Sequence, residues 1–435
     1  DALQGANDIV AEWISDDAAI RRSLRELLEK RGTLRSLAAT EEDSVYRLYY
    51  DFEQPLSRLQ GHQILAINRG EKEEFLKVAL TVPEDVVLGY LYNRVLSGNR
   101  SPAEPYVREA VTDAYNRLIA PSIEREIRND LFDTACEGAI KVFSDNLGHL
   151  LMQPPLKGKV VLGFDPGYAH GCKLAVVDPT GKVLDTAVVY PTIKPRAEEA
   201  ARVVKRLIRN YAVDVVAIGN GTASRESEAF IAGLLKQIEK PCKYIIVSEA
   251  GASIYSASQL AAEEFPDFDV MQRSAVSIAR RLQDPLAELV KIDPKGIGIG
   301  QYQHDMKQAQ LDEALGGVVE SCVNAVGVDI NTASYSLLSY IAGINQTAAK
   351  NIVKYREENG AFTTRGQVTK VPRIGAKAFQ QCAGFLRVPG GREALDNTGV
   401  HPESYDCARR LLSMFGYSEA DIANGGLTGL RQKVV

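Results

Sequence analysis

The sequence predicts a multidomain protein of the α plus α/β class, and three observations support that prediction. The 435 residues correspond to about three domains of roughly 150 residues each. Hydrophobic residues follow a helical spacing up to about residue 155, and near Lys159 the pattern changes to short buried runs typical of strands. A basic stretch further on contains two related short segments. We therefore expect an all-helical domain at 1–156, an α/β domain at 157–289, a helical connector at 290–328, a tandem hairpin domain at 329–390 and a small helical C-terminal region at 391–435.

Composition places the chain among ordinary cytoplasmic proteins. Hydrophobic residues make up 45% and charged residues 25% of the sequence, and no apolar run approaches the ~20 residues needed to cross a bilayer. The six cysteines include no CxxC pair, so the sequence predicts neither a disulfide framework nor a zinc cluster. Because the sequence starts at Asp1, without an initiator methionine or a signal segment, we expect it to be a fragment of a longer protein.

The first 156 residues show apolar stripes at helical spacing. Leu24, Leu27 and Leu28 form one stripe, and Val87 and Leu91 belong to another. Glu and Arg alternate along Glu124 to Arg128, as on the solvated face of a helix. We expect this region to be entirely helical and assign no chemistry to it.

The α/β domain begins with a buried strand that ends in Asp165. Two further strands, at 173–177 and 183–190, would form a meander with it, and helices then alternate with strands at 213–218 and 244–247. Three antiparallel strands followed by alternating helices and strands indicate an α/β layered fold.

Three carboxylates of this domain form a candidate metal site. Asp165 ends the first strand, Glu249 follows the fifth, and Asp284 precedes a helix. Phosphodiester hydrolysis on such a sheet needs three or four carboxylates around one or two Mg²⁺ ions, and we expect these three to meet at one edge. Asn220 stands at the end of the fourth strand, where enzymes that hydrolyse phosphodiesters on such a sheet usually have another acid. Asp165, Glu249 and Asp284 are therefore candidates for a vestigial nuclease site, and Mg²⁺ is the cofactor that an intact site would bind. The sequence leaves open whether the protein is an enzyme.

Each of these residues also has a structural interpretation. Asp165-Pro166-Gly167 is turn chemistry in its own right, and Glu249 is suited to capping or hydrogen bonding beside a glycine. Asp284 before Pro285 has the pattern of a helix N-cap. We interpret His170 as a surface loop residue rather than a base.

Positive charge is concentrated in the window from Ile330 to Gly390. Eight bases against two acids give this window a charge of +6, whereas the whole chain carries −5 and the remainder therefore −11. The bases are Lys350, Lys354, Arg356, Arg365, Lys370, Arg373, Lys377 and Arg387. Such asymmetry is typical of a module that faces a polyanion on an acidic carrier.

The same window contains two hairpin motifs. Gly343-Ile344-Asn345 separates two helical stripes, and Arg373-Ile374-Gly375 recurs thirty positions later. Both resemble the helix-hairpin-helix motif, in which glycine permits the tight turn, isoleucine plugs the helix pair and free amides receive a phosphate oxygen. We expect unusual backbone geometry at Gly343 and Gly375, and an Asn345 that tolerates positive φ. The candidate nucleic-acid-binding residues are Gly343, Ile344, Asn345, Lys350, Arg373, Ile374, Gly375 and Lys377.

Several segments carry a resemblance to a known family. Phe164-Asp165-Pro166-Gly167 and the run from Ser248 to Ser253 resemble the YqgF domain, an RNase H-like relative of RuvC-type resolvases. Together with Pro121 to Glu126, Ile67 to Lys72 and the stretch 279–305, they resemble the Tex family of bacterial transcription accessory proteins. The resemblance implies a YqgF domain without a complete nuclease site, and RNA or DNA, RNA polymerase and other transcription factors as partners. It also implies a C-terminal OB-fold RNA-binding domain, which this sequence lacks.

Three functional hypotheses follow. The leading one is a transcription accessory scaffold that binds RNA or DNA without sequence preference, because contacts to phosphates read no bases. The second is a Mg²⁺-dependent, structure-specific nuclease that uses Asp165, Glu249 and Asp284. The third is a platform that docks proteins of the transcription machinery, which is favoured only if the basic window proves buried.

Overall fold

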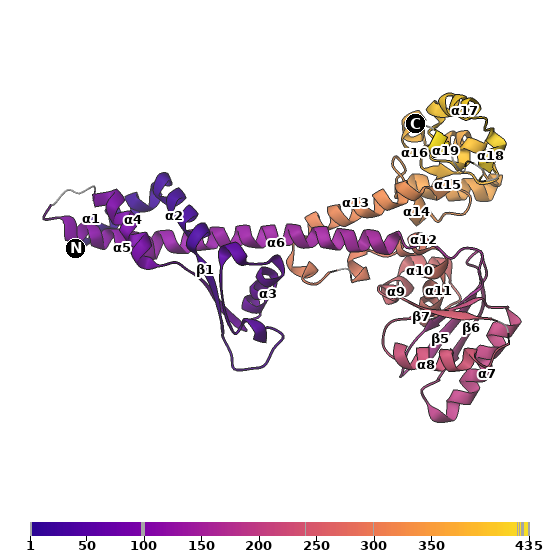
Figure 1. Cartoon of the computed structure of the whole chain (residues 1–435), viewed down its shortest axis with the longest axis horizontal. Coiled ribbons are helices and arrows are strands. Elements are labelled where there is room, and N and C mark those ends of the chain that lie inside the picture. Colours follow the sequence, from indigo (N-terminus) through magenta and orange to yellow (C-terminus); the bar gives the residue numbers. More distant parts are fainter. Residues whose placement is uncertain are drawn as a thin grey trace. The chain divides into compact units, whose positions relative to one another are not determined.

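The computed structural model describes residues 2–96, 101–239, 241–298, 300–423, 425, 427 and 430–433. The chain divides into two compact units. The first unit comprises residues 1–143 with 300–311, and the second comprises 144–299 with 312–435 (Figure 1). Among the described helices we find none with the length and apolar character needed to cross a lipid bilayer.

The first unit is mainly helical. Its helices are α1 (Ala2–Asp16), α2 (Ala18–Arg31), α3 (Gly61–Lys72), α4 (Glu84–Leu96), α5 (Glu104–Asp113) and the part of α6 (Ala120–Leu151) up to residue 143, with a π-helical turn at Ala114–Ile119 before α6. The expected stripes are buried: Leu24, Leu28, Val87 and Leu91 belong to one apolar core. Asp17 begins α2 by accepting hydrogen bonds from the backbone N–H groups of Ala19 and Ile20.

The prediction that this region is entirely helical was wrong. Strands β1 (Thr33–Ala38), β2 (Asp51–Pro55) and β3 (Leu76–Thr81) form an antiparallel sheet in the order β2-β1-β3. Only Leu34 and Ser36 are buried in the central strand, so its period-2 signal is short and half polar. The helical stripes on both sides dominate a strand signal this short. Pairing with β2 and β3 is what makes the segment a strand.

The second unit contains the expected α/β sheet. Strands β4 (Val161–Asp165), β5 (Cys172–Val177), β6 (Val183–Val189), β7 (Val215–Gly219) and β8 (Lys243–Val247) lie in the order β6-β5-β4-β7-β8. β4 pairs antiparallel with β5 and parallel with β7, and β7 pairs parallel with β8. The carboxyl ends of β4, β7 and β8 therefore meet at one edge.

Helices cover both faces of this sheet (Figure 1). Leu162 and Phe164 of β4 pack into a core with α7 (Lys194–Asn210) and α8 (Ser224–Leu235), whereas Val161 packs on the other face with α11 (Val270–Gln283). The short helices α9 (Ala252–Ser256), α10 (Gln259–Glu264) and α12 (Pro285–Leu289) complete the domain. This mixed five-strand sheet between helical layers confirms the predicted α/β fold.

Short helices then build the hairpin region. After 3₁₀ turns at Pro294–Ile297 and Gln303–Asp305 come α13 (Gln308–Val326), α14 (Tyr335–Leu338), α15 (Gln346–Asn359), a 3₁₀ helix at Arg365–Lys370 and α16 (Ala376–Cys382). Strands β9 (Val328–Asp329) and β10 (Leu386–Arg387) pair in parallel and bracket the two hairpins. The C-terminal part has 3₁₀ turns at Ala394–Asn397 and Pro402–Ser404, followed by α17 (Tyr405–Met414), α18 (Glu419–Ala423) and α19 (Leu430–Lys433).

Arg365 fixes the C-terminal part to the second hairpin. Its side chain is 1% exposed and donates hydrogen bonds to the carbonyl oxygens of Leu386, Val400 and Thr398. Its backbone N–H donates to the carboxylate of Asp396 at 2.7 Å. A buried guanidinium needs several acceptors to offset its desolvation, and here backbone carbonyls provide them.

Candidate functional site

The edge of the α/β sheet brings Asp165 and Glu249 together. Asp165 ends β4, and Glu249 follows β8 by two residues. Burial raises the pKa of Asp165, while a hydrogen bond from Ser274 and the charge of Lys173 oppose that rise. Burial also raises the pKa of Glu249, and the negative charge of Asp165 adds to that rise, which places the two carboxylates in one electrostatic site.

Asp284 does not join this pair. Its side chain accepts a hydrogen bond from the backbone N–H of Ala287 at 3.0 Å and caps α12, whose first residue is Pro285. Within the described ranges, no group of three or more His, Cys, Asp or Glu side chains is placed to hold a metal ion. The expected meeting of three carboxylates was therefore wrong, because the local capping interaction decides where Asp284 points.

Asn220 has a structural role at this edge. Its side-chain oxygen accepts a hydrogen bond from the backbone N–H of Glu249 at 3.0 Å and so ties the loop after β7 to the loop after β8. A backbone hydrogen bond from Gly221 also reaches the carboxylate of Glu249. Both contacts depend on the pairing of β7 with β8, which a local sequence pattern does not predict.

Two cations at this edge are not expected from the sequence. Lys173 of β5 is the cross-strand neighbour of Asp165, and Arg281 of α11 is only 4% exposed. Arg281 donates hydrogen bonds to the carbonyl oxygens of Ser248 and Ala250 at 2.9 and 2.7 Å, so it holds the loop that carries Glu249. Arg280-Arg281 gives no sequence signal that one arginine of the pair is buried.

These residues do not fit the magnesium site that an RNase H-like fold implies. Two carboxylates are present where a two-metal site needs three or four. The charges of Lys173 and Arg281 already act on Glu249 and oppose the rise of its pKa. A divalent ion at this edge would have to compete with both cations.

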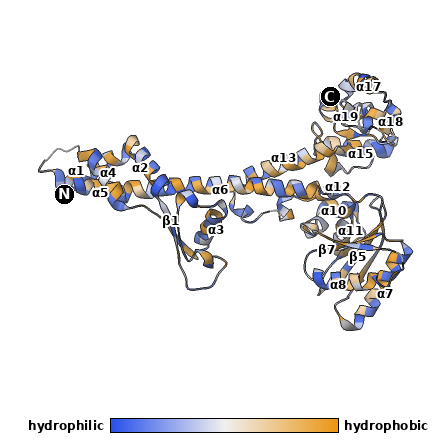
Figure 2. Ribbon diagram, in the orientation of Figure 1, coloured by the Kyte–Doolittle hydropathy of each residue, from blue (hydrophilic) through white to orange (hydrophobic). Residues whose placement is uncertain are grey.

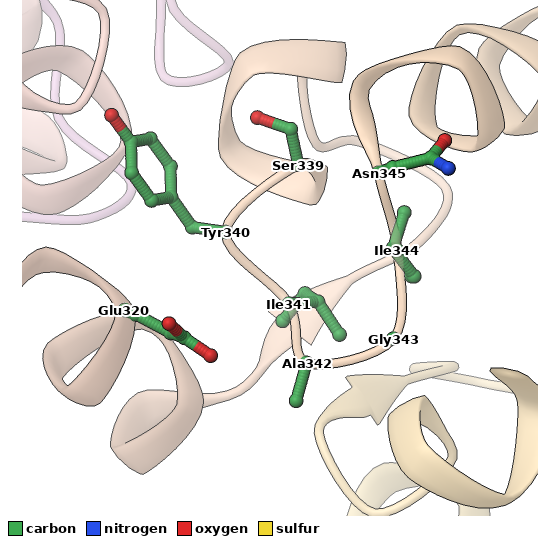
Figure 3. Close-up of a pocket in the computed structure, with 8 residues that line it drawn as sticks. All are labelled: Glu320, Ser339, Tyr340, Ile341, Ala342, Gly343, Ile344 and Asn345. Atoms are coloured by element: carbon green, nitrogen blue, oxygen red, sulfur yellow. The ribbon is translucent and has the colours of Figure 1, made fainter. Parts of the chain in front are cut away.

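The first hairpin is built by α14, a turn and α15 (Figure 3). Gly343 has φ +81°, as expected for the tight turn, and Ile344 is 3% exposed and packs inside the helix pair. Asn345 differs from the expectation of positive φ: its φ is −84°, and its side chain accepts a hydrogen bond from the N–H of Ala348. Asn345 is thus the N-cap of α15, a role that asparagine fills well.

The second hairpin uses different residues for the same geometry. Arg373, thirty positions after Gly343, has φ +74°, a conformation that is costly for a residue with a side chain. Gly375 has φ −85° and is the N-cap of α16. The prediction of unusual geometry at Gly375 was wrong, because the register places Arg373, not Gly375, at the left-handed position. Ile374 is 4% exposed and repeats the packing role of Ile344.

The two hairpins contact each other reciprocally. Asn351 of α15 donates a hydrogen bond to the carbonyl oxygen of Pro372 in the second turn at 2.9 Å. In the first turn, a Cβ on Gly343 would lie 2.8 Å from the Cβ of Gln381 on α16. Asn351 and Gln381 are thirty residues apart, like Ile344 and Ile374, so the two units are related by a local pseudo-twofold arrangement.

Each turn presents equivalent backbone donors. The N–H groups of Gly343 and Asn345 in the first turn, and of Arg373 and Gly375 in the second, have no hydrogen-bond acceptor within the part of the chain that the structure describes. All four residues are exposed. Unpaired backbone N–H groups of this kind can donate hydrogen bonds to phosphate oxygens. A neighbouring donor is already used, because the N–H of Ala342 donates to Asn324 of α13 at 3.3 Å.

Side chains around the turns carry charge of both signs. Lys350 and Lys377 are exposed, and the Lys350 ammonium lies 5.0 Å from the centroid of the Tyr335 ring. The first turn also lines a pocket of about 410 Å³ together with Glu320 of α13 (Figure 3). Glu320 places a negative charge beside the first turn, which opposes phosphate binding there.

The basic window is mostly exposed. Five of its eight bases, Lys350, Lys354, Lys370, Arg373 and Lys377, face solvent. Arg365 is buried, and burial lowers the pKa of the half-buried Arg356 and Arg387. The condition that would favour a docking platform, a buried basic window, is not met.

The RNase H-like sheet has two carboxylates at its edge, and it is joined to paired helical hairpins. This combination defines a multidomain protein of the YqgF and helix-hairpin-helix class. Comparison with known families agrees with this class. Residues 1–143 match the Tex central region-like family and residues 159–283 the Tex protein YqgF-like domain. Residues 323–387 match the helix-hairpin-helix motif and residues 393–433 the HHH domain. The chain belongs to the Tex family.

Relatives from distant organisms match the whole chain. The protein YdcI of Bacillus subtilis is 51% identical over all of this chain and 61% of its own length. The transcriptional accessory protein Tex of Neisseria gonorrhoeae is 46% identical over 100% of this chain and 57% of its own length. The human S1 RNA-binding domain-containing protein 1 is 40% identical over 99% of this chain and 49% of its own length. The chain thus spans about half to three fifths of the relatives it matches.

Proposed function

We propose that this chain is the nucleic-acid-binding scaffold of a cytoplasmic transcription accessory factor, and that it binds without sequence preference through its two hairpins. The observation that carries the proposal is the repeated set of exposed, unpaired amides at Gly343, Asn345, Arg373 and Gly375. Two such sets in a pseudo-twofold arrangement suit the two phosphate backbones of a duplex. Amides and ammonium groups recognise phosphates and read no bases.

The names of the relatives support the same proposal. A transcriptional accessory protein and an S1 RNA-binding domain-containing protein are both similar to nearly all of this chain. We propose RNA polymerase or another transcription factor as the protein partner, since a scaffold that holds nucleic acid sequence-independently needs a partner to direct it. The five exposed bases of the hairpin region agree with a polyanionic ligand.

We also propose that the YqgF-like domain is not a nuclease. Its sheet edge offers the pair Asp165 and Glu249, while Asp284 caps a helix and Asn220 ties two loops together. Two carboxylates beside Lys173 and Arg281 do not offset the charge of two divalent ions and a scissile phosphate. The domain then serves as a rigid structural part of the scaffold.

The test is binding of this chain to short duplexes and single strands of unrelated sequence across a salt series. The proposal expects similar affinities for different sequences and a steep loss of affinity with salt, because each neutralised phosphate of duplex DNA contributes a log–log slope of about −0.9. Affinity that depends strongly on sequence, or that does not change with salt, would contradict it.

A further inference from the structure

A second basic surface lies on the α/β domain, away from the hairpins in the sequence. Helix α7 contains six bases and two acids and so carries +4. Its apolar residues Ala200, Val204, Leu207 and Ile208 pack into the core beneath the sheet, and its polar residues face outward (Figure 2). The two acids, Glu198 and Glu199, lie in the first half of the helix, and residues 200–213 include no acid at all.

Three arginines form a stripe on the outer face of the second half. Arg202, Arg206 and Arg209 follow one another at spacings of four and three residues, which places them on one side of a helix. All three are exposed, and among the residues that the structure describes none of them forms an ion pair or a hydrogen bond. We call these three residues the α7 stripe.

Some other arginines of the chain pair with an acid four residues earlier, whereas Arg22, Arg31 and Arg225 are, like the stripe, unpaired among the described residues. Arg108 pairs with Glu104, Arg117 with Asp113 and Arg47 with Asp43, each four residues earlier. Next to the α7 stripe, the carboxylate of Asp185 accepts hydrogen bonds from the Tyr211 hydroxyl and the Thr186 N–H. Lys205 of α7 donates to Gln237 at 2.8 Å. The three arginines are therefore unpaired among the described residues, with Glu198 and Glu199 one helical turn before Arg202 and Asp185 beside Tyr211 as nearby acids.

The spacing of the stripe fits a phosphate backbone. Seven residues of α-helix span about 10.5 Å at ~1.5 Å per residue, and one strand of duplex DNA presents a phosphate about every 3.4 Å along the helix axis. The stripe is thus about three phosphate intervals long, which is enough for its three arginines to reach phosphates along one strand. A planar guanidinium binds phosphate oxygens in pairs, so the residue type agrees with the spacing.

We propose that the α7 stripe is a second contact surface for the phosphate backbone of nucleic acid. The inference rests on the proposed nucleic-acid-binding function and extends it from the hairpins to the YqgF-like domain. It assigns to Arg202, Arg206 and Arg209 a role in holding the backbone without reading its bases.

The test compares three variants of the 435-residue chain for binding to a random-sequence duplex across a salt series. The first replaces the stripe by Arg202→Gln, Arg206→Gln and Arg209→Gln. The second, a control with the same change in net charge, is Arg47→Gln, Arg108→Gln and Arg117→Gln. The third, Glu198→Gln with Glu199→Gln, removes the acids of α7. Melting temperatures of all three verify that the exposed substitutions leave the fold intact.

We expect the stripe variant to lower the log–log salt slope by about 2 to 3 and the affinity at moderate salt by at least about tenfold, given a slope of about 0.9 per phosphate. The charge control should stay within about twofold of the unmodified chain, because the attraction of distant cations is screened by salt. Removing Glu198 and Glu199 should raise the affinity, because these acids lie within one helical turn of Arg202. A stripe variant that behaves like the charge control would overturn the inference.

Its failure can be told apart from failure of the hairpin proposal. If the duplex binds and only substitutions in the hairpins weaken it, the α7 inference is wrong and the hairpin proposal stands. If the unmodified chain binds no nucleic acid, both fail. If the stripe variant loses binding of an oligoglutamate peptide but retains duplex binding, the stripe faces an acidic protein and the inference is again wrong.

Discussion

Asn351 of α15 and Gln381 of α16 occupy equivalent positions in the two hairpin units, and each lies against the turn of the other unit. Asn351 donates a hydrogen bond to Pro372, and Gln381 packs against the backbone of Gly343. This exchange fixes the spacing between the two sets of free amides. The hairpins therefore act as one rigid interface, and changes at either turn affect both.

Lys350 and Lys377 should account for part of the phosphate contacts of the hairpins. Lys350→Ala with Lys377→Ala is expected to weaken duplex binding about tenfold or more and to lower the log–log salt slope by about 1 to 2. Lys354→Ala is the matched control, because Lys354 lies on the same helix but pairs with Glu358. Equal effects of Lys350→Ala and Lys354→Ala would show that the turns are not the binding surface.

Arg373→Gly should change stability and binding in opposite directions. Glycine relieves the left-handed backbone conformation at this position, which we expect to stabilise the fold by about 1 kcal/mol. Loss of the cation beside the free amides should weaken nucleic-acid binding. Arg373→Ala separates the two effects: it removes the charge but keeps the strained backbone, so binding should fall without a gain in melting temperature. A less stable Arg373→Gly would contradict the assignment of strain.

Gly343 and Gly375 should respond differently to alanine. Gly343 combines φ +81° with a Cβ position 2.8 Å from Gln381, so Gly343→Ala should destabilise the fold by about 2 to 3 kcal/mol. Gly375 has negative φ and open space where its Cβ would be, so Gly375→Ala should cost less than about 1 kcal/mol. Denaturant unfolding of both variants measures the difference, and equal losses would refute the register.

The Asp165 and Glu249 pair should make the fold more stable as pH falls from neutral. The pKa of each carboxyl is raised in the folded state, so the folded chain holds these protons more tightly than the unfolded chain, and stability is lost as pH rises through the raised pKa values. Asp165→Asn should raise the melting temperature by a few degrees at about pH 7 and by less near pH 5. The measurement is the difference in melting temperature between Asp165→Asn and the unmodified chain as a function of pH. A difference that is constant with pH would rule out this explanation.

Nuclease activity should be absent. Purified protein with Mg²⁺ or Mn²⁺ should cleave duplex, flap and four-way-junction substrates no faster than Asp165→Asn. Cleavage that disappears in both Asp165→Asn and Glu249→Gln would reject the scaffold proposal and favour the metal-dependent nuclease.

The amino-acid sequence by itself determined the fold class, the five strands of the α/β domain and the two hairpins, because these depend on local hydrophobic period and on turn residues that recur at a fixed spacing. Leu162 and Phe164 alternate with Val161 to face two helical layers, and Ile344 and Ile374 plug their hairpins. Such features are encoded within a few neighbouring residues. The family resemblance rested on the same segments.

Only the tertiary structure decided where the polar groups point. Asn220 holds the loop of Glu249, and Arg281 is buried beneath that loop. The register of the second hairpin puts Arg373 where glycine was expected, and cross-strand pairing turns a short stretch of the first unit into a sheet. Each of these outcomes depends on partners distant in the chain, whose hydrogen bonds and burial no local pattern encodes.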